Sequence, residues 1–540
     1  MVFGQPQAGN GGQAAATTYD AVLYQGHPFA QTHPDRLATL ATLFGMKPAP
    51  VDRCRVLELG CGDGGNLYPM AYTLPDSEFL GIDLAARPIA HGQAMARALG
   101  LKNITLRQLD LMEVHGDFGE FDYIIAHGLY SWVPLAVQDK LLAICKAHLA
   151  PQGVAYVSYN TFPGHHLQRL VREMMRFHVR QFAEPARQIQ HALAFVKFVA
   201  EAKPEPGTYQ TLLQQILGEL LDHDPASLYH DDLADVNLPV YFHQFVEHAG
   251  RHGLQFLSEA NFSQMQDRMF PPHVCDTLRV LAKDQIVLKE QYLDFLKGRK
   301  FRQTLLCHQD VALERDLKPE LMAGFYVASA AKSVSATPDI CSTAVEEFRG
   351  PHESAMSTGH PLAKAAIMEL AESWPRPLPF NELHLKVQSR LGPGGRDEAV
   401  EAEDPALALG KIILATYAAG LVELHLHMPQ FVMDVSERPV ASPVARLQAK
   451  QETHDTVVTT MRHAMIRVEG SLERHLLMLL DGTRDRAALL NELAGLVKSG
   501  AVTMGQDGAS VPDREKALQI LSQGLEPNLE KLARLALLVA

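Results

Sequence analysis

Short apolar runs alternate with amphipathic segments in the first third of the chain. Segments such as 87–99 and 137–149 place apolar residues at i, i+3 and i+4, a spacing typical of helices with one buried face. Strands that alternate with helices form βαβ units, so the pattern predicts an α/β fold with a parallel, Rossmann-like sheet. The predicted strands are 55–60, 78–83, 104–110, 121–126 and 154–160.

Helical periodicity dominates the middle of the chain. Residues 165–310 are predicted to form a helical regulatory or dimerisation domain. Its expected helices are 167–182, 189–202 and 209–223. Ser, Thr, Pro and Gly then become frequent, so residues 311–360 are predicted to be a linker or irregular region.

Two further units are predicted in the C-terminal part. Residues 361–440 resemble a winged-helix domain that ends in the alternating strand 421–426, and residues 441–540 are predicted to be mostly helical. The expected winged-helix helices are 362–373, 380–391 and 407–419. At the other end, a Gly- and Gln-rich tail at 1–18 is predicted to be disordered and not a signal peptide; the sheet domain follows at 19–164.

Length and charge narrow the classes of protein to consider. At 540 residues the chain exceeds what one hydrophobic core supports, in keeping with several domains. The net charge of −13 disfavours nucleic acid as a partner and suits a basic one, such as a lysine-bearing peptide. The predicted winged helix lacks a basic recognition helix, so we expect it to contact protein. Scattered cysteines and the lack of an apolar run of roughly 20 residues predict a cytoplasmic protein without membrane insertion.

A glycine-rich turn follows the first predicted strand. It reads ELGCGDGGN over residues 58–66, and its glycines permit positive φ and a close approach of ligand to backbone. Asp83 ends the second predicted strand, where a carboxylate can bind both ribose hydroxyls. These features also fit a dinucleotide-binding fingerprint, so they leave NAD and S-adenosylmethionine open. The turn residues predicted to contact the cofactor are Gly60, Gly62, Gly64 and Asn66.

Residues at three other positions favour S-adenosylmethionine. Glu58 stands directly before the glycines, where it would repel a pyrophosphate but suits a sulfonium and an amino group. Asp110 and the backbone N–H of Leu111 follow the third strand, where they can bind the adenine edge. His127 and Gly128 follow the fourth, beside the amino-acid part of the ligand. We therefore predict S-adenosylmethionine, and not NAD, as the cofactor.

Longer stretches resemble class I methyltransferases that carry a methyltransferase regulatory domain. The most specific are ELGCGDGGN and SYNTFPG, at 58–66 and 158–164. The chain is similar to the rickettsial protein-lysine methyltransferases that modify outer membrane protein B. The resemblance implies a lysine methyltransferase, with a homodimer as one form of assembly and an outer-membrane or secreted protein as one class of substrate. It continues at residues 19–20, 28–37, 241–245, 291–295, 301–306 and 479–483.

The same resemblance draws attention to the segment before the helix predicted at 35–44. Gln31 and His33 precede the first strand in a polar stretch, and we predict that they close over the cofactor. The alternative is that this stretch caps the helix, with Thr32 or Asp35 near its start.

Side chains after the last two predicted strands suit a channel for a lysine substrate. A methyl acceptor must be a neutral amine aligned with the sulfonium, and desolvation favours that neutral form. Aromatic faces can hold the cationic head, and Asn160 can accept a hydrogen bond from the amine. The alternative is that the aromatic residues cap the core. The residues predicted for this channel are Tyr130, Trp132, Tyr159 and Asn160.

Histidines gather in the middle of the chain without a known metal-binding motif. His248 and His252 are spaced to share a helix face beside Glu247, but the HExxH pattern is missing. Helical histidines are commonly packing or surface residues, so we predict no metal.

Three functions remain open on the sequence. Large accessory domains favour a macromolecular substrate and hence a protein-lysine methyltransferase. A small-molecule methyltransferase with a helical lid is the second reading, and a non-enzymatic sensor that binds S-adenosylmethionine is the third.

Overall fold

The computed structural model describes residues 26–203, 207–351, 353–392, 404–451, 456–468, 470–502 and 514–540. The predicted tail at 1–18 and residues 19–20 of the family resemblance lie outside the described residues. Within the described part, no helix combines the length and apolar character needed to cross a membrane.

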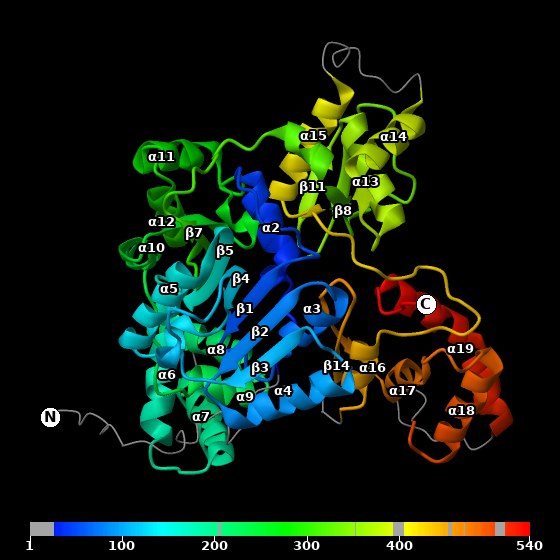
Figure 1. The fold of residues 1–540 in the computed structure, drawn as a ribbon, viewed down its shortest axis with the longest axis horizontal. Coiled ribbons are helices and arrows are strands. Elements are labelled where there is room, and N and C mark those ends of the chain that lie inside the picture. Colours follow the sequence, from blue (N-terminus) through cyan, green and yellow to red (C-terminus); the bar gives the residue numbers. More distant parts are fainter. Residues whose placement is uncertain are drawn as a thin grey trace.

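A mixed sheet of seven described strands forms the centre of the molecule, in the order β3-β2-β1-β4-β5-β7-β6 (Figure 1). Strands β1 to β5 pair in parallel, whereas β7 runs antiparallel to both β5 and β6. The strand order reverses between β1 and β4, and a crevice opens at the carboxyl ends of strands at such a point. The predicted α/β, Rossmann-like fold is confirmed. The strands are β1 (Arg55–Leu59), β2 (Glu78–Asp83), β3 (Ile104–Gln108), β4 (Phe121–Ala126), β5 (Leu149–Asn160), β6 (Leu254–Glu259) and β7 (Phe301–His308).

Helices cover both faces of the sheet, and alternation along each strand assigns every side chain to one face. On β1, Val56 packs in the cluster that contains α2 and α3, while its neighbour Leu57 packs in the cluster with α5 and α10. A register slip of one residue would exchange these faces, so burial on both sides fixes the strand ends in place. The covering helices are α2 (Pro34–Leu43), α3 (Leu67–Thr73), α4 (Ala86–Ala98), α5 (Leu135–His148) and α10 (Phe242–Arg251).

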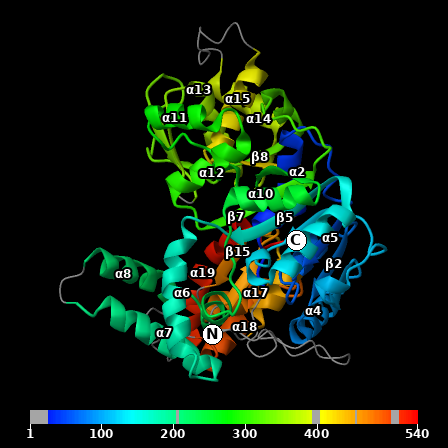
Figure 2. The same cartoon turned by 90° about the vertical axis from the view of Figure 1, so that its left-hand side faces the viewer.

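The segment between β5 and β6 leaves the sheet as a helical arm. Helices α6 (His165–Val179), α7 (Pro185–Ala200) and α8 (Thr208–Leu221) share their own apolar cluster, and α7 and α8 project away from the sheet (Figure 2). The predicted helices in this part are confirmed. A short helix, α9 (Pro225–Ser227), and a π-helical turn, η4 (Leu228–Asp232), lead back toward the sheet.

The prediction that residues 165–310 are helical throughout is wrong in its second half. Strands β6 and β7 lie there and complete the central sheet, with α11 (Pro272–Ala282) and α12 (Ile286–Lys297) between them. Both strands are buried along most of their length, so residues on both faces of the sheet are covered. Such runs lack the clean period of two that marks a strand in sequence.

The region 311–360 is also more regular than predicted. It contains the 3-10 helix η6 (Pro319–Gly324) and short strands that belong to two small three-stranded sheets, so the expectation of an irregular linker is wrong. These strands have two to four residues each, too few to show a period. They are β8 (Tyr326–Ala328), β9 (Lys332–Ser333), β10 (Glu346–Arg349) and β11 (Ala355–Thr358).

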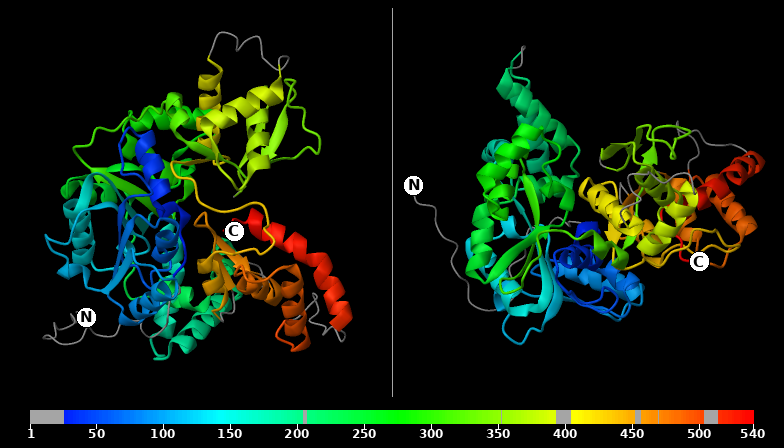
Figure 3. Two further views of the ribbon diagram at one scale, coloured as in Figure 1. Left: turned by 45° about the vertical axis from the view of Figure 1, so that its right-hand side comes forward. Right: turned by 90° about the horizontal axis from the view of Figure 1, so that it is seen from above.

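The C-terminal part forms two units that lie on one side of the sheet domain (Figure 3). The three helices predicted between 361 and 419 are present, and the second unit packs on α3 and α4 through Val444, Tyr68 and Met95. The elements of the first are α13 (Pro361–Ser373), β12 (Leu378–Pro379), α14 (Phe380–Leu391), α15 (Pro405–Ala418) and β13 (Glu423–His425). Those of the second are α16 (Pro443–Ala449), β14 (Thr456–Thr459), β15 (Met465–Val468), α17 (Ser471–Leu479), α18 (Arg486–Lys498) and α19 (Arg514–Arg534).

Candidate functional site

A cavity of about 660 Å³ opens at the carboxyl ends of β1, β2, β4 and β5, where the strand order reverses. Residues from five predicted motifs meet in it, together with residues from α6 and η4 that are remote in sequence. The predicted site residues that line it are Glu58, Gly60, Gly62, Asn66, Asp83, Asp110, Leu111, His127, Gly128, Trp132 and Asn160.

The glycine-rich turn shapes the floor of this cavity. Gly62 has φ +55°, and a Cβ added there would meet no described atom within 4 Å, so the backbone lies open to a ligand. Its N–H donates to Asp83 Oδ2 at 2.9 Å, which fixes the turn against the end of β2. Gly64 serves packing instead: its Cβ would lie 2.9 Å from Leu106 Cδ1, and it does not line the cavity.

Glu58 is a buried carboxylate at the base of the turn. Its Oε1 accepts a hydrogen bond from Asn66 Nδ2 at 2.9 Å, while Oε2 has no hydrogen-bond partner among the described residues. Burial raises the pKa of Glu58 to about 8, because desolvation disfavours the charged form. A buried carboxylate with one unmatched oxygen is suited to a cationic ligand, which would restore its ionised form.

Asp83 and Asp110 hold the turns that follow their strands while facing the cavity. Asp83 Oδ1 accepts from Ala85 N at 2.8 Å, and Asp110 Oδ1 accepts from Met112 N at 2.9 Å. Each carboxylate is therefore fixed in position before any ligand arrives. Preformed acceptors of this kind are typical of sites for ribose and adenine.

His127 closes the cavity beside Phe29. Its Nδ1 lies 2.9 Å from the Tyr156 hydroxyl, and the rings of His127 and Phe29 have centroids 3.8 Å apart. Burial lowers the pKa of His127 to about 4, so this imidazole is neutral at physiological pH. It therefore contributes a hydrogen-bonding edge and no positive charge.

Gln31 and His33 do not line the cavity, contrary to the prediction. His33 Nδ1 accepts a hydrogen bond from Asp35 N at 3.2 Å, so this stretch caps α2, as in the alternative, but with His33 and not Thr32 or Asp35 as the capping residue. The cofactor-facing residues of the segment are instead Gly26, His27 and Phe29. Helix capping and ligand contact both use polar residues before a helix, so the sequence alone could not distinguish these two roles.

Asn66 joins the cavity to distant parts of the chain. Its Oδ1 accepts from Phe29 N and from His463 Nε2, each at 3.0 Å. His463 lies in the turn between β14 and β15, near the other end of the sequence. Glu58, the N-terminal segment and the C-terminal unit therefore meet in one hydrogen-bonded chain.

Comparisons with known proteins match this arrangement. The family model "Methyltransferase domain" covers residues 56–153, and "Predicted methyltransferase regulatory domain" covers 224–308. An uncharacterized protein of Rickettsia prowazekii, RP789, is 34% identical over 537 residues, which is 98% of this chain and 95% of that protein. The chain belongs to the class I methyltransferases with a regulatory domain.

A solved structure extends the match to the whole methyltransferase and to its cofactor. PKMT2 from Rickettsia typhi, in complex with AdoHcy, aligns with a TM-score of 0.84 and 28% identity, over 96% of this chain and all of that one. AdoHcy is what remains of S-adenosylmethionine after methyl transfer. The methyltransferase therefore uses S-adenosylmethionine, and the residues that line the cavity fit it.

One comparison corrects the domain assignment. The family model "PKMT, C-terminal winged helix domain" matches residues 437–537, whereas the sequence analysis placed the winged helix at 361–440 and expected mostly helix beyond it. The short β14–β15 hairpin supplies the strands of the matched domain. Four-residue strands beside long helices left that hairpin unrecognised in the sequence.

A narrower chamber of about 210 Å³ adjoins the cofactor cavity of the methyltransferase. Apolar side chains of α6 and α8, such as Met175 and Ile216, form its walls, and Lys300 bridges to Glu219 across it at 2.8 Å. The residues that line both spaces are Asn160, His165, Gln168, Asp232 and Phe301.

Two neighbouring carboxylates face the cofactor cavity from η4. Burial and the adjacent charge of Asp232 raise the pKa of Asp231 to about 7. A carboxylate with this pKa can accept a proton near neutral pH. The sequence did not single out these two residues, since nothing in the local pattern places η4 near the end of β5.

Two of the four predicted channel residues point elsewhere. Tyr159 is buried on the opposite face of β5 from Asn160, with its hydroxyl 3.0 Å from Thr304 Oγ1 and its ring stacked on Phe245. Tyr130 is likewise buried, with its hydroxyl 2.8 Å from His248 Nδ1. Neither lines either space, so their assignment to the channel is wrong, and the core-packing alternative describes them.

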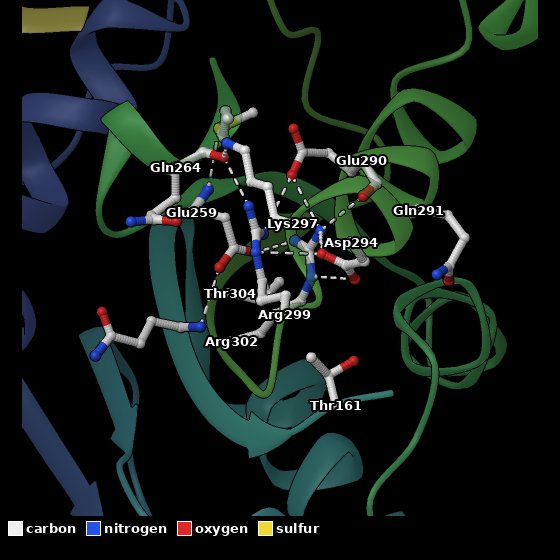
Figure 4. Close-up of polar contacts among 12 residues, drawn as sticks. Thr161, Glu259, Gln264, Glu290, Gln291, Asp294, Lys297, Arg299, Arg302 and Thr304 are labelled. Atoms are coloured by element: carbon white, nitrogen blue, oxygen red, sulfur yellow. Dashed lines mark hydrogen bonds and ion pairs between the residues drawn. The ribbon is translucent and has the colours of Figure 1, made fainter. Parts of the chain in front are cut away.

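The start of β7, which carries Phe301 to the cavity, is fixed by a buried ion network (Figure 4). Arg302 donates to Glu259 Oε1 at 2.6 Å and to Asp294 Oδ2 at 2.9 Å, so it ties β7 to β6 and α12. The neighbouring backbone carbonyl of Lys300 accepts from Thr161 N at 3.0 Å. The SYNTFPG segment is thus hydrogen-bonded to the residue that precedes β7, next to this ion network.

Proposed function

We propose that the enzyme transfers methyl groups to lysine side chains of a protein substrate. The observation that carries the proposal is the small, mostly apolar chamber beside the cofactor cavity, with Asp232 lining both spaces and Asp231 lining the cofactor cavity. A lysine side chain has a long apolar stem, which suits the apolar walls of the chamber, and a cationic end, which suits the carboxylates beside the cofactor cavity. The name PKMT2 of the Rickettsia typhi protein agrees with this assignment.

Asp231 is proposed as the acceptor of the ammonium proton. Once the amine is neutral, its lone pair forms the N–C bond to the methyl group as the C–S bond breaks, and AdoHcy leaves. The proton resides on Asp231 until solvent removes it. Asn160 would orient the amine through a hydrogen bond, and the faces of Trp132 and Phe301 would accommodate its positive charge.

The proposed substrate class is a lysine-bearing protein, with an outer-membrane or secreted protein as the expected kind. The net charge of −13 attracts basic segments, and the units outside the sheet domain offer room for a macromolecule.

The test supplies methyl-labelled S-adenosylmethionine and purified enzyme to fractionated lysate of the source cell. Label in a discrete protein band, traced by mass spectrometry to lysine and lost with Asp231→Asn, is the expected result. Label confined to small molecules would support the small-molecule alternative. No transfer, with cofactor binding intact, would support the sensor.

A homodimer is proposed as the form of assembly. Large apolar side chains are exposed on the helical arm, including Phe177 at 63% and Phe198 at 68%. Both lie on the arm formed by α6, α7 and α8, where a second copy would cover them. Light scattering should give twice the chain mass for the wild type, and Phe177→Glu with Phe198→Glu should give a monomer. A monomeric wild type at micromolar concentration would refute the dimer.

A further inference from the structure

Three potential metal ligands converge behind the wall of the cofactor cavity. Asp139 lies on α5, His248 on the last turn of α10 and His252 directly after that helix. One ligand atom from each lies within 4.8 Å of the other two. Asp139 Oδ1 is 3.2 Å from His248 Nε2 and 2.9 Å from His252 Nε2.

From this geometry we infer that Asp139, His248 and His252 bind a divalent transition-metal ion of the Zn²⁺ class. Zn²⁺ is held at about 2.0–2.1 Å by His nitrogen and at about 2.0–2.2 Å by carboxylate oxygen, which sets tetrahedral ligand atoms about 3.3–3.5 Å apart. The two distances above need only small side-chain rotations to reach that spacing. Imidazole nitrogen with a carboxylate oxygen is a ligand set that such ions favour.

A second observation orients the ligands. His248 Nδ1 lies 2.8 Å from the Tyr130 hydroxyl, so this ring can keep its proton on Nδ1 and present the Nε2 lone pair to a metal. Metal-binding histidines are typically held in this way by a partner on the other ring nitrogen. The Asp139 side chain is 62% exposed, which leaves a path for the ion and a position for water.

The site joins elements that border the cofactor cavity. Asp139 follows Val137 by two residues on α5, and Tyr130 begins the 3-10 turn η3 (Tyr130–Trp132) that carries Trp132; Val137 and Trp132 both line the cavity. A bound ion would cross-link α5 to α10 and steady this wall. No metal was predicted from the sequence, because the HExxH pattern is missing and helical histidines are commonly packing or surface residues. The third ligand comes from α5, more than 100 positions away.

The test measures Zn²⁺ binding to the full chain, free of any purification tag, by competition with a chromophoric chelator. Wild type should bind one Zn²⁺ per chain, and Co²⁺ in its place should give a ligand-field absorption. Asp139→Asn and His252→Ala should each weaken binding by about tenfold or more. The matched control is Glu247→Gln, which removes an exposed carboxylate from the same helix turn but none of the three ligands, and it should bind as wild type.

Thermal unfolding provides a second readout. Zn²⁺ should raise the Tm of wild type and Glu247→Gln by a few degrees and leave that of Asp139→Asn unchanged, since only binding to the folded state stabilises it. Asp139 is mostly exposed, so its amide variant should fold. Equal Zn²⁺ affinity in wild type and Asp139→Asn, or no binding by the wild type, would overturn the inference.

Discussion

The two chambers of the site are built in different ways. The cofactor cavity takes most of its lining from residues 58–137, where each strand delivers its end residues directly to the same edge of the sheet. The adjoining chamber combines α6, α8, η4 and the start of β7, which come together only through the fold. The binding site for S-adenosylmethionine, the cofactor shared by this class of methyltransferases, is thus built from local sequence motifs. The surface proposed to select the substrate depends on long-range packing, which can change without disturbing the cofactor motifs.

The largest effect is expected for Asp231→Asn, a change on η4 at the edge of the cofactor cavity. If Asp231 accepts the ammonium proton, kcat should fall on the order of 10²–10⁴-fold, the usual contribution of a general base. The Kd for S-adenosylmethionine should stay within about twofold.

The pH profile sharpens this test. Because the pKa of Asp231 is raised to about 7, the residue is protonated and inactive as an acceptor below that pH. In wild type, kcat/KM should therefore rise with pH through about 7 and then level off. In the Asp231→Asn variant this rise should be absent. Asp235→Asn, a change at an exposed residue of the same region, is the control and should behave as wild type. Unchanged turnover in Asp231→Asn would remove Asp231 from the mechanism.

Asp83→Ala should act on the cofactor chamber instead. Asp83 is predicted to bind the ribose hydroxyls, and a hydrogen bond to a charged group contributes about 1.5–3 kcal/mol, so affinity for S-adenosylmethionine should fall by roughly 10- to 100-fold. Calorimetry measures it directly. Asp122→Ala provides a matched control, since Asp122 lies on β4 away from the lining residues. Unaltered cofactor affinity in Asp83→Ala would contradict the assignment of this cavity.

Glu58→Gln tests whether Glu58 loses a proton when the cationic cofactor binds. The pKa of Glu58 is about 8 without ligand, so at neutral pH the residue is protonated and must lose its proton to pair with the cationic cofactor. Affinity for S-adenosylmethionine should therefore increase by up to about tenfold per pH unit as pH rises toward 8, and level off above it. Calorimetry in buffers of different ionisation enthalpy should detect the released proton. The Gln variant should lose this part of the pH dependence; an identical profile in both would refute the coupling.

The smallest effects are expected on β5, where adjacent residues face opposite sides. Asn160→Ala should reduce kcat/KM for the protein substrate by roughly tenfold through loss of one hydrogen bond to the amine, without weakening cofactor binding. Tyr159→Phe should leave kcat/KM unchanged and lower the free energy of unfolding by about 1 kcal/mol, because it loses only the Thr304 contact. A large loss of kcat/KM in Tyr159→Phe would contradict the conclusion that the Tyr159 side chain faces away from the cavity.

The parts of the site that could be predicted from the sequence are those in which a polar residue suited to the cofactor stands at a clear strand end. Glu58 lies one residue before the end of β1, Asp83 ends β2 and Asp110 follows β3, and all three line the cavity. Tyr159 was misplaced because a strand end alone does not say which face its last side chains take. Asp231 was missed because its proposed role depends on η4 returning to the sheet. Strand β7 was missed because its buried positions include the polar residues Arg302 and Thr304, so the strand shows no hydrophobic alternation.

The bond from His463 to Asn66 has a consequence for how the enzyme is made. Since a ribosome completes the glycine-rich turn long before it reaches His463, a nascent chain has the whole cofactor motif but not its last hydrogen-bond partner. Full affinity for S-adenosylmethionine would then be reached only after the winged-helix domain has been synthesised and has docked. A chain that ends at residue 436 should accordingly bind S-adenosylmethionine more weakly than the full chain, and equal affinity would show that the turn is complete without its final domain.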